Sequence, residues 1–168
     1  LIMNFNFIAI AAASILPLLI GFLWYNPKTF GNAWMKEAEM TEEKMKNANM
    51  ILIFGVTILF SIFLSLGLYS MVIHQPHIYS TLINEPAFQD PNSDLSIMVK
   101  DFMNLYGNNF RTFKHGAFHG LIGSILVILP VISVNALFER KSFKYILINW
   151  GFWATCMILM GGIISAYA

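Results

Sequence analysis

The sequence predicts an all-α fold, an integral membrane four-helix bundle formed by a single domain over residues 1–168. Two observations carry this prediction. Hydrophobic residues make up 57% of the chain and charged residues only 11%, whereas soluble proteins carry about 25% charged residues. Four blocks also lack Asp, Glu, Lys and Arg, and each reaches the roughly 20 residues that a helix needs to cross a bilayer. These spans cover about 5–24, 50–74, 116–138 and 145–167.

The first span, 5–24, has two interpretations, a retained helix or a cleavable signal peptide. A signal peptide carries basic residues before its apolar run and small residues at its end. Here the first lysine is Lys28, beyond the run, and the small residues Ala11–Ser14 lie in its middle. We therefore expect a retained transmembrane helix.

The loop after this span predicts a short helix lying in the membrane interface. Pro27 suits the first position of a helix. Phe30, Trp34 and Met35 then follow at helical spacing, with the charged Lys36 beside them. Aromatic residues of this kind anchor helices at the bilayer surface.

The second span is expected to extend further into the loop than its apolar run. Thr41 is a candidate N-cap, and the acids Glu42 and Glu43 suit a first helical turn. The residue before a proline avoids the helical conformation, so Pro76 predicts a stop. The sequence thus predicts one helix from near Thr41 to His74.

The long second loop, 75–114, contains a turn-rich stretch followed by a predicted amphipathic helix, LSIMVKDFMNLY, capped by Ser93 or Asp94. One face of this helix is apolar and the other carries Lys100 and Asp101. Such a helix forms a lid over the membrane mouth of the protein or covers the ends of the bundle. The apolar positions are Leu95, Met98, Val99, Phe102 and Leu105.

Basic residues predict the orientation in the membrane, because cytoplasmic loops are enriched in Lys and Arg. The second loop holds Lys100, Arg111 and Lys114, against seven basic residues in the other two loops. Both termini and the second loop are therefore expected outside. The seven basic residues of those two loops are Lys28, Lys36, Lys44, Lys46, Arg140, Lys141 and Lys144.

The net charge of the chain is +1. It gives no sign of the basic surface that nucleic-acid binding requires.

The predicted spans contain no charged residue, which argues against ion or proton transport. Their polar residues are serines, threonines and two asparagines that flank the last hairpin, Asn135 and Asn149. We expect these two to form a structural hydrogen-bonded pair in the lipid. A small-molecule channel lined by serines and asparagines is a further hypothesis. The one cysteine, Cys156, lies inside the fourth span and is interpreted as a packing residue.

Small residues recur every four positions in the last two spans, as in Gly116, Gly120 and Ser124, and in Gly161 and Ser165. Such seams let helices approach closely, within one chain or between chains. They favour a non-enzymatic structural or accessory protein, acting as a homo-oligomer or as a subunit of a larger membrane complex.

All four histidines of the chain fall at one membrane face: His74 and His77 after the second span, His115 and His119 at the start of the third. Because His115 and His119 are four residues apart, they project from one side of a helix. Zinc, copper or haem iron binds neutral imidazoles in such an arrangement. The alternative function is therefore a metal-, haem- or quinone-binding protein. A carboxylate from the second loop is a possible further ligand, and simple interfacial histidines are the competing interpretation.

Three long strings carry a resemblance to a known family: GFLWYNPKTFGNAWMKEA, FRTFKHGAFHG and LPVISVNALFERKSFKYILIN. Together they resemble a bacterial membrane family, domain of unknown function 1761, over nearly the whole chain. Within them, Asn26–Pro27, His115–Gly116 and His119–Gly120 resemble the family's signature. The resemblance implies a four-helix protein of the bacterial cytoplasmic membrane. It implies no activity, cofactor or catalytic residue.

Overall fold

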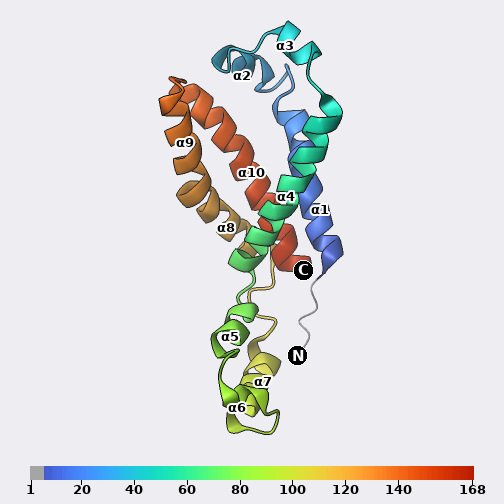
Figure 1. Ribbon diagram of the computed structural model, residues 1–168, viewed down its shortest axis with the longest axis vertical. Helices are drawn as coiled ribbons and strands as arrows, with labels where there is room; N and C mark the ends of the chain where they lie inside the picture. Colours follow the sequence, from blue (N-terminus) through green and yellow to red (C-terminus); the bar gives the residue numbers. More distant parts are fainter. Residues whose placement is uncertain (1–5) are drawn as a thin grey trace.

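The computed structural model describes residues 6–168, and the regular secondary structure of this part is entirely helical. Four helices are long and apolar enough to cross a membrane, which confirms the predicted class (Figure 1). They are α1 (Phe7–Trp24), α4 (Met50–Val72), a continuous helix over Phe113–Phe138, and α10 (Phe143–Tyr167). The predicted spans agree with these bounds to within three residues. The predicted first residue of the first span, Phe5, lies outside the described part.

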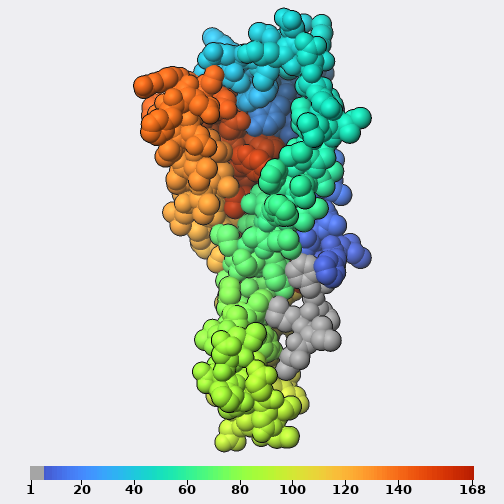
Figure 2. Space-filling view, in the orientation of Figure 1, coloured from blue at the N-terminus to red at the C-terminus, as the bar shows by residue number. Residues whose placement is uncertain are grey.

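Three of the long helices, α1, α4 and the third long helix, pack around the fourth, α10. Half of the residues in the apolar 18-residue stretch of α10 are buried inside the protein, against 17% of those in the corresponding stretch of α4. Figure 2 shows α10 recessed between α4 and the third helix. The largest fully buried side chains are Leu68, Ile73, Met160 and Ile164. Most apolar side chains of α4 instead face outward, as expected of a helix that contacts lipid.

Shorter helices lie at both ends of the four long helices (Figure 1). The short helices α2 (Gly31–Glu37) and α3 (Glu42–Lys46) lie at the end that also holds the turn between the third long helix and α10. The opposite end carries the second loop, which projects away as three helices, and the C-terminus. These helices are α5 (Gln75–Leu82), α6 (Pro86–Gln89) and α7 (Asp94–Tyr106).

The small-residue seam on the third long helix closes against α10 within one chain. A Cβ atom added at Gly116 would overlap the carbonyl oxygen of Gly161, and one added at Gly120 would overlap that of Met157. Glycine is therefore required here by the close approach of two backbones. The seam does not remain free for a second copy of the chain.

The third long helix consists of α8 (Phe113–Gly123), a π-helical segment η1 (Ser124–Ile128) and α9 (Leu129–Phe138). Pro130 lies at the start of α9 and lacks the N–H that would continue an α-helical ladder. The wider π-helical turn shifts the backbone hydrogen bond next to the proline, so that the Leu129 N–H donates to Ser124 O. The indole N–H of Trp150 also donates to Ser124 O, at 3.1 Å. The segment thus passes the proline without breaking the helix.

The predicted start of the second helix near Thr41 is wrong. Thr41 does cap a helix, accepting a bond from Lys44 N at 3.2 Å, but this helix is the short α3. The membrane helix α4 has its own cap, because the Asn49 side chain accepts from Leu52 N at 3.1 Å. Two competing caps therefore divide the segment into two helices.

The predicted end of that helix at His74 is wrong as well. The last residue of α4 is Val72, and Ile73 adopts an extended conformation with φ −106° and ψ 109°. Pro76 then lies in the first turn of α5 rather than stopping α4. A proline is tolerated there because a first-turn N–H has no partner within the helix.

The two predicted loop helices exist, with a shifted start in one case. The amphipathic helix is α7, and Ser93 caps it by accepting from Ser96 N at 3.1 Å. The interfacial helix is α2, but it begins at Gly31 and not at Pro27. Pro27 lies in a turn whose Asn26 carbonyl accepts from Gly31 N at 2.9 Å.

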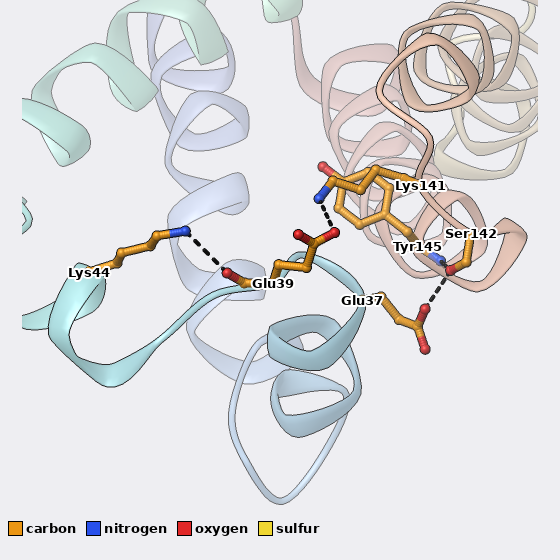
Figure 3. A network of polar contacts seen from close by, with 6 residues as sticks. All are labelled: Glu37, Glu39, Lys44, Lys141, Ser142 and Tyr145. Atoms are coloured by element: carbon orange, nitrogen blue, oxygen red, sulfur yellow. Dashed lines mark hydrogen bonds and ion pairs between the residues drawn. The ribbon is translucent and has the colours of Figure 1, made fainter.

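Polar contacts join the segment after α2 to the hairpin before α10 (Figure 3). Lys141 Nζ lies 2.9 Å from Glu39 Oε1, and Ser142 Oγ donates to Glu37 Oε2 at 2.5 Å. The hydrogen bond from Ser142 and the charge of Lys144 hold the pKa of the Glu37 carboxyl below its usual value. The first and third loops therefore form one connected surface.

The predicted pair of asparagines does not form. The Asn149 side chain accepts from Tyr25 Oη at 3.0 Å and donates to the Tyr145 carbonyl at 2.8 Å. Asn135 is exposed on α9. Asn149 thus joins α10 to the end of α1 instead of to α9.

Candidate metal site

The break after α4 determines where His74 lies. Ile73 is fully buried, at 0% exposure, and its extended backbone separates the axis of α4 from that of α5. His74 is the residue before α5 and lies at the end of the long helices where the second loop begins. Gln75 fixes the turn further, because its Nε2 donates to the Asn109 carbonyl at 3.1 Å.

The packing of α8 determines where the other two histidines lie. Gly116 and Gly120 face α10, as their contacts with its backbone show. His115 and His119 each precede one of these glycines, so they lie about 100° around the helix from the seam. Thr112 caps the helix, accepting from His115 N at 3.3 Å. The seam therefore turns both imidazoles away from α10.

The break after α4 and the packing of α8 on α10 bring His74, His115 and His119 together. Each offers a ring nitrogen, and these three atoms all lie within 4.8 Å of one another. The ring of His119 lies 4.5 Å from that of His115 and 5.1 Å from that of His74, between centroids. His74 Nε2 and His115 Nε2 are 3.0 Å apart. We call these three residues the histidine triad.

His77 does not join the triad, although the sequence grouped all four histidines. Its ring centroid lies 6.4 Å from that of His74, and its side chain is exposed on α5. No carboxylate of residues 6–168 joins the three imidazoles either. The acids of the second loop, any of which was expected as a possible further ligand, therefore lie outside the cluster. They are Glu85, Asp90, Asp94 and Asp101.

The surroundings of His74 lower its pKa and so favour a neutral imidazole at this residue. Burial lowers the pKa of His74, and the neighbouring His119 and His77 lower it further by repelling a second positive charge. The 3.0 Å contact between His74 and His115 also requires that one ring nitrogen donate and the other accept. The neutral form is the one that binds metal ions.

The spacing of the triad nitrogens suits a single metal ion. Zn²⁺ binds imidazole nitrogen at about 2.0–2.1 Å in tetrahedral geometry, which places two ligand nitrogens roughly 3.4 Å apart. The observed separations, from 3.0 Å up to 4.8 Å, bracket that value. Small side-chain rotations would therefore complete a three-nitrogen site. Haem iron has only two axial positions for protein ligands, so three converging imidazoles favour an ion without a porphyrin.

Two features beside the triad, the turn at Phe110 and a cleft, could not be predicted from the sequence. Phe110 adopts a left-handed conformation, with φ 63°, and its ring centroid lies 5.1 Å from that of His115. Its carbonyl accepts from Ser165 Oγ at 3.1 Å, which ties this turn to α10. Beside the triad, a cleft of about 400 Å³ opens between α5 and α7, with His74 in its wall.

Four membrane-length helices make the chain a multi-pass helical membrane protein in architecture. A family model described as "Protein of unknown function (DUF1761)" matches residues 8–165. The chain belongs to this family, and the resemblance carried by the three sequence strings is confirmed. Comparisons with curated proteins and with solved structures gave no match.

Proposed function

We propose that the protein is a membrane-embedded metal-binding protein that holds a divalent first-row ion such as Zn²⁺ with His74, His115 and His119. The observation that carries the proposal is the convergence of three ring nitrogens within 4.8 Å, from the turn between α4 and α5 and from α8, which lie far apart in the sequence. Imidazole ligands suit zinc, copper, nickel and iron, and exclude calcium and magnesium as preferred ions.

The alternative to a metal is a hydrogen-bonded histidine cluster at the membrane interface. Such a cluster accounts for the contact of His74 with His115, which takes one donor and one acceptor. It gives no reason for His119 to lie close to both of them. A metal ion uses one nitrogen of every ring, and this favours the metal-binding function.

The location we propose is the bacterial cytoplasmic membrane, with the triad at the outer face. The excess of Lys and Arg in the first and third loops supports this orientation. These loops lie at one end of the long helices, and the triad with the second loop at the other (Figure 1).

The accessory role in a homo-oligomer or larger complex stays a prediction. The seam of Gly116 and Gly120 that motivated it packs against α10 of the same chain. A mass measurement in mild detergent tests the role, since a homo-oligomer or a copurifying partner would support it and a lone monomer would not.

Metal content tests the proposed function. The protein is purified in mild detergent with an affinity tag that contains no histidine and without chelators. Elemental analysis and calorimetric titration with Zn²⁺ should give one tightly bound ion per chain. The triple variant His74→Ala/His115→Ala/His119→Ala should lose it.

The chain provides its own matched control. His77→Ala removes an exposed imidazole three residues from His74, and we expect it to keep full zinc stoichiometry. Equal zinc binding by the wild type and the triple variant would refute the proposed site.

A further inference from the structure

The cleft beside the triad adjoins a second hollow along α5 and α7. The first, of about 400 Å³, has His74, Phe102, Met103 and Phe110 in its wall. The second, of about 210 Å³, is lined by apolar side chains alone, among them Met98. Ile78 and Phe102 belong to both walls. We call these two adjoining hollows the apolar groove.

The groove is long and apolar, and one end of it reaches a proposed metal ligand. It leads from His74 away from the long helices, between the two loop helices that project from them (Figure 1). Met98 and Phe102 stay 60% and 46% exposed on its side. Apolar side chains along such a hollow suit a hydrocarbon chain, whose apolar surface they would remove from water.

The metal chemistry supplies the other half of the recognition. Three histidines leave one position of a tetrahedral zinc ion open, as in zinc sites that bind a water or a substrate oxygen. His74 is shared between the triad and the groove, and Phe110 of the groove contacts the ring of His115. A metal ion held by the triad would therefore lie beside the groove.

We propose that the metal and the apolar groove together bind a free long-chain carboxylic acid, with one carboxylate oxygen on the metal and the hydrocarbon chain in the groove. This inference rests on the proposed metal site. Carboxylate oxygen is an ordinary zinc ligand, and its negative charge complements the ion. A membrane-soluble acid also reaches the site directly, because the groove begins where α4 ends.

Cobalt-loaded protein in phosphatidylcholine nanodiscs tests the inference, because the visible spectrum of Co²⁺ responds to its ligands. Palmitate should change this spectrum and saturate at one molecule per chain. Hexadecanol, with the same chain and no carboxylate, should leave the spectrum unchanged. Octanoate has the carboxylate and a shorter chain, so it should need at least about tenfold more ligand for the same change, which corresponds to about 1.4 kcal/mol.

Two variants of neighbouring residues on α7 separate the groove from the metal. Met98→Glu places a negative charge on the groove wall and should weaken palmitate binding at least about tenfold. Ile97→Glu makes the same change at a residue that lines neither hollow and is 46% exposed. It should bind palmitate as the wild type does. Both variants should keep their metal.

The outcomes distinguish the two proposals. Protein that binds Co²⁺ but shows no spectral change with palmitate overturns the carboxylic-acid inference and leaves the metal site standing. The same holds if octanoate equals palmitate, or if Met98→Glu has no effect. Failure to bind Co²⁺ or Zn²⁺ at all overturns the metal site, and this inference with it.

Discussion

His74 Nε2 and His115 Nε2 lie 3.0 Å apart across 41 positions of sequence. The contact depends on two features of the backbone. Extended Ile73 ends α4 one residue before His74, and the glycine seam of α8 turns His115 away from α10. The triad is thus a consequence of how the membrane helices end and pack, and it links the fold to the proposed function.

The first prediction concerns the pH dependence of zinc binding. Protons compete with the metal for each ring nitrogen, so the affinity should fall as the pH drops through and below about 6.5, the ordinary pKa of histidine. Because the pKa of His74 is lowered, its imidazole stays neutral to a lower pH than an ordinary histidine. Calorimetric titration at several pH values measures this. An affinity unchanged between about pH 5 and 8 would contradict a histidine site.

The metal-free protein should show the matching stability effect. A folded-state pKa below that of the unfolded chain means that the unfolded chain takes up protons first as the pH falls. Stability is therefore full above pH 6.5, the ordinary value for His74, and is lost as the pH falls below it. Thermal unfolding of wild type and His74→Ala checks this, since the variant should show a smaller loss.

The second prediction tests the seam between α8 and α10. Gly120→Ala adds a methyl group that meets the Met157 backbone. We expect a loss of roughly 1–3 kcal/mol in the free energy of unfolding, as for other overpacked sites. The control is Gly55→Ala, whose added methyl group meets nothing within 4 Å. Unfolding in detergent that is equally unchanged for both variants would contradict the packing of α8 on α10.

The third prediction concerns the buried contact between α1 and α4. Ser14 Oγ donates to the Ile10 carbonyl at 2.8 Å and lies 2.9 Å from Ser65 Oγ. The Ser65 hydroxyl therefore donates to Ser14. Removing it in Ser65→Ala should cost about 0.6 kcal/mol, the average for hydrogen bonds between membrane helices.

Ser61 provides the control for this contact. It lies one turn away on α4, and its buried hydroxyl has no hydrogen-bond partner in the described chain. Ser61→Ala should therefore leave stability unchanged or raise it. An equal loss in both variants, measured by unfolding in detergent, would show that the contact between Ser14 and Ser65 contributes nothing specific.

The fourth prediction tests the orientation in the membrane. Cys156 is fully buried, so a single introduced cysteine reports its own position. A membrane-impermeant maleimide should label Lys100→Cys in intact cells. Lys36→Cys, at the opposite end of the molecule, should react only after the membrane is permeabilised. The reverse pattern would place the triad in the cytoplasm.

Much of the fold could be predicted because membrane helices are specified by composition. Runs without charge located all four long helices, and the Ser93 and Thr41 caps were local signals. The break before His74 could not be predicted, because Ile73 belongs to the apolar run and carries no local signal for its extended conformation. Pro76 indicated a helix stop and instead begins the next helix.

The site was predictable in part, because the spacing of residues within one helix can be read from the sequence. The spacing of His115 and His119 fixes their shared face from sequence alone. Choosing His74 over His77 required the direction of α5, which depends on tertiary packing. The partner of Asn149 was wrong because the end of α1 brings Tyr25 to it, and no periodicity within one helix carries that information.

X-ray absorption at the zinc edge of the zinc-loaded protein tests the central claim most directly. The account predicts a first shell of four light atoms at about 2.0–2.1 Å, with the outer-shell scattering of three imidazoles. The same spectrum should persist in His77→Ala and disappear in the triple triad variant. A shell of oxygen atoms without imidazole scattering, or one that survives loss of the triad, would contradict the account.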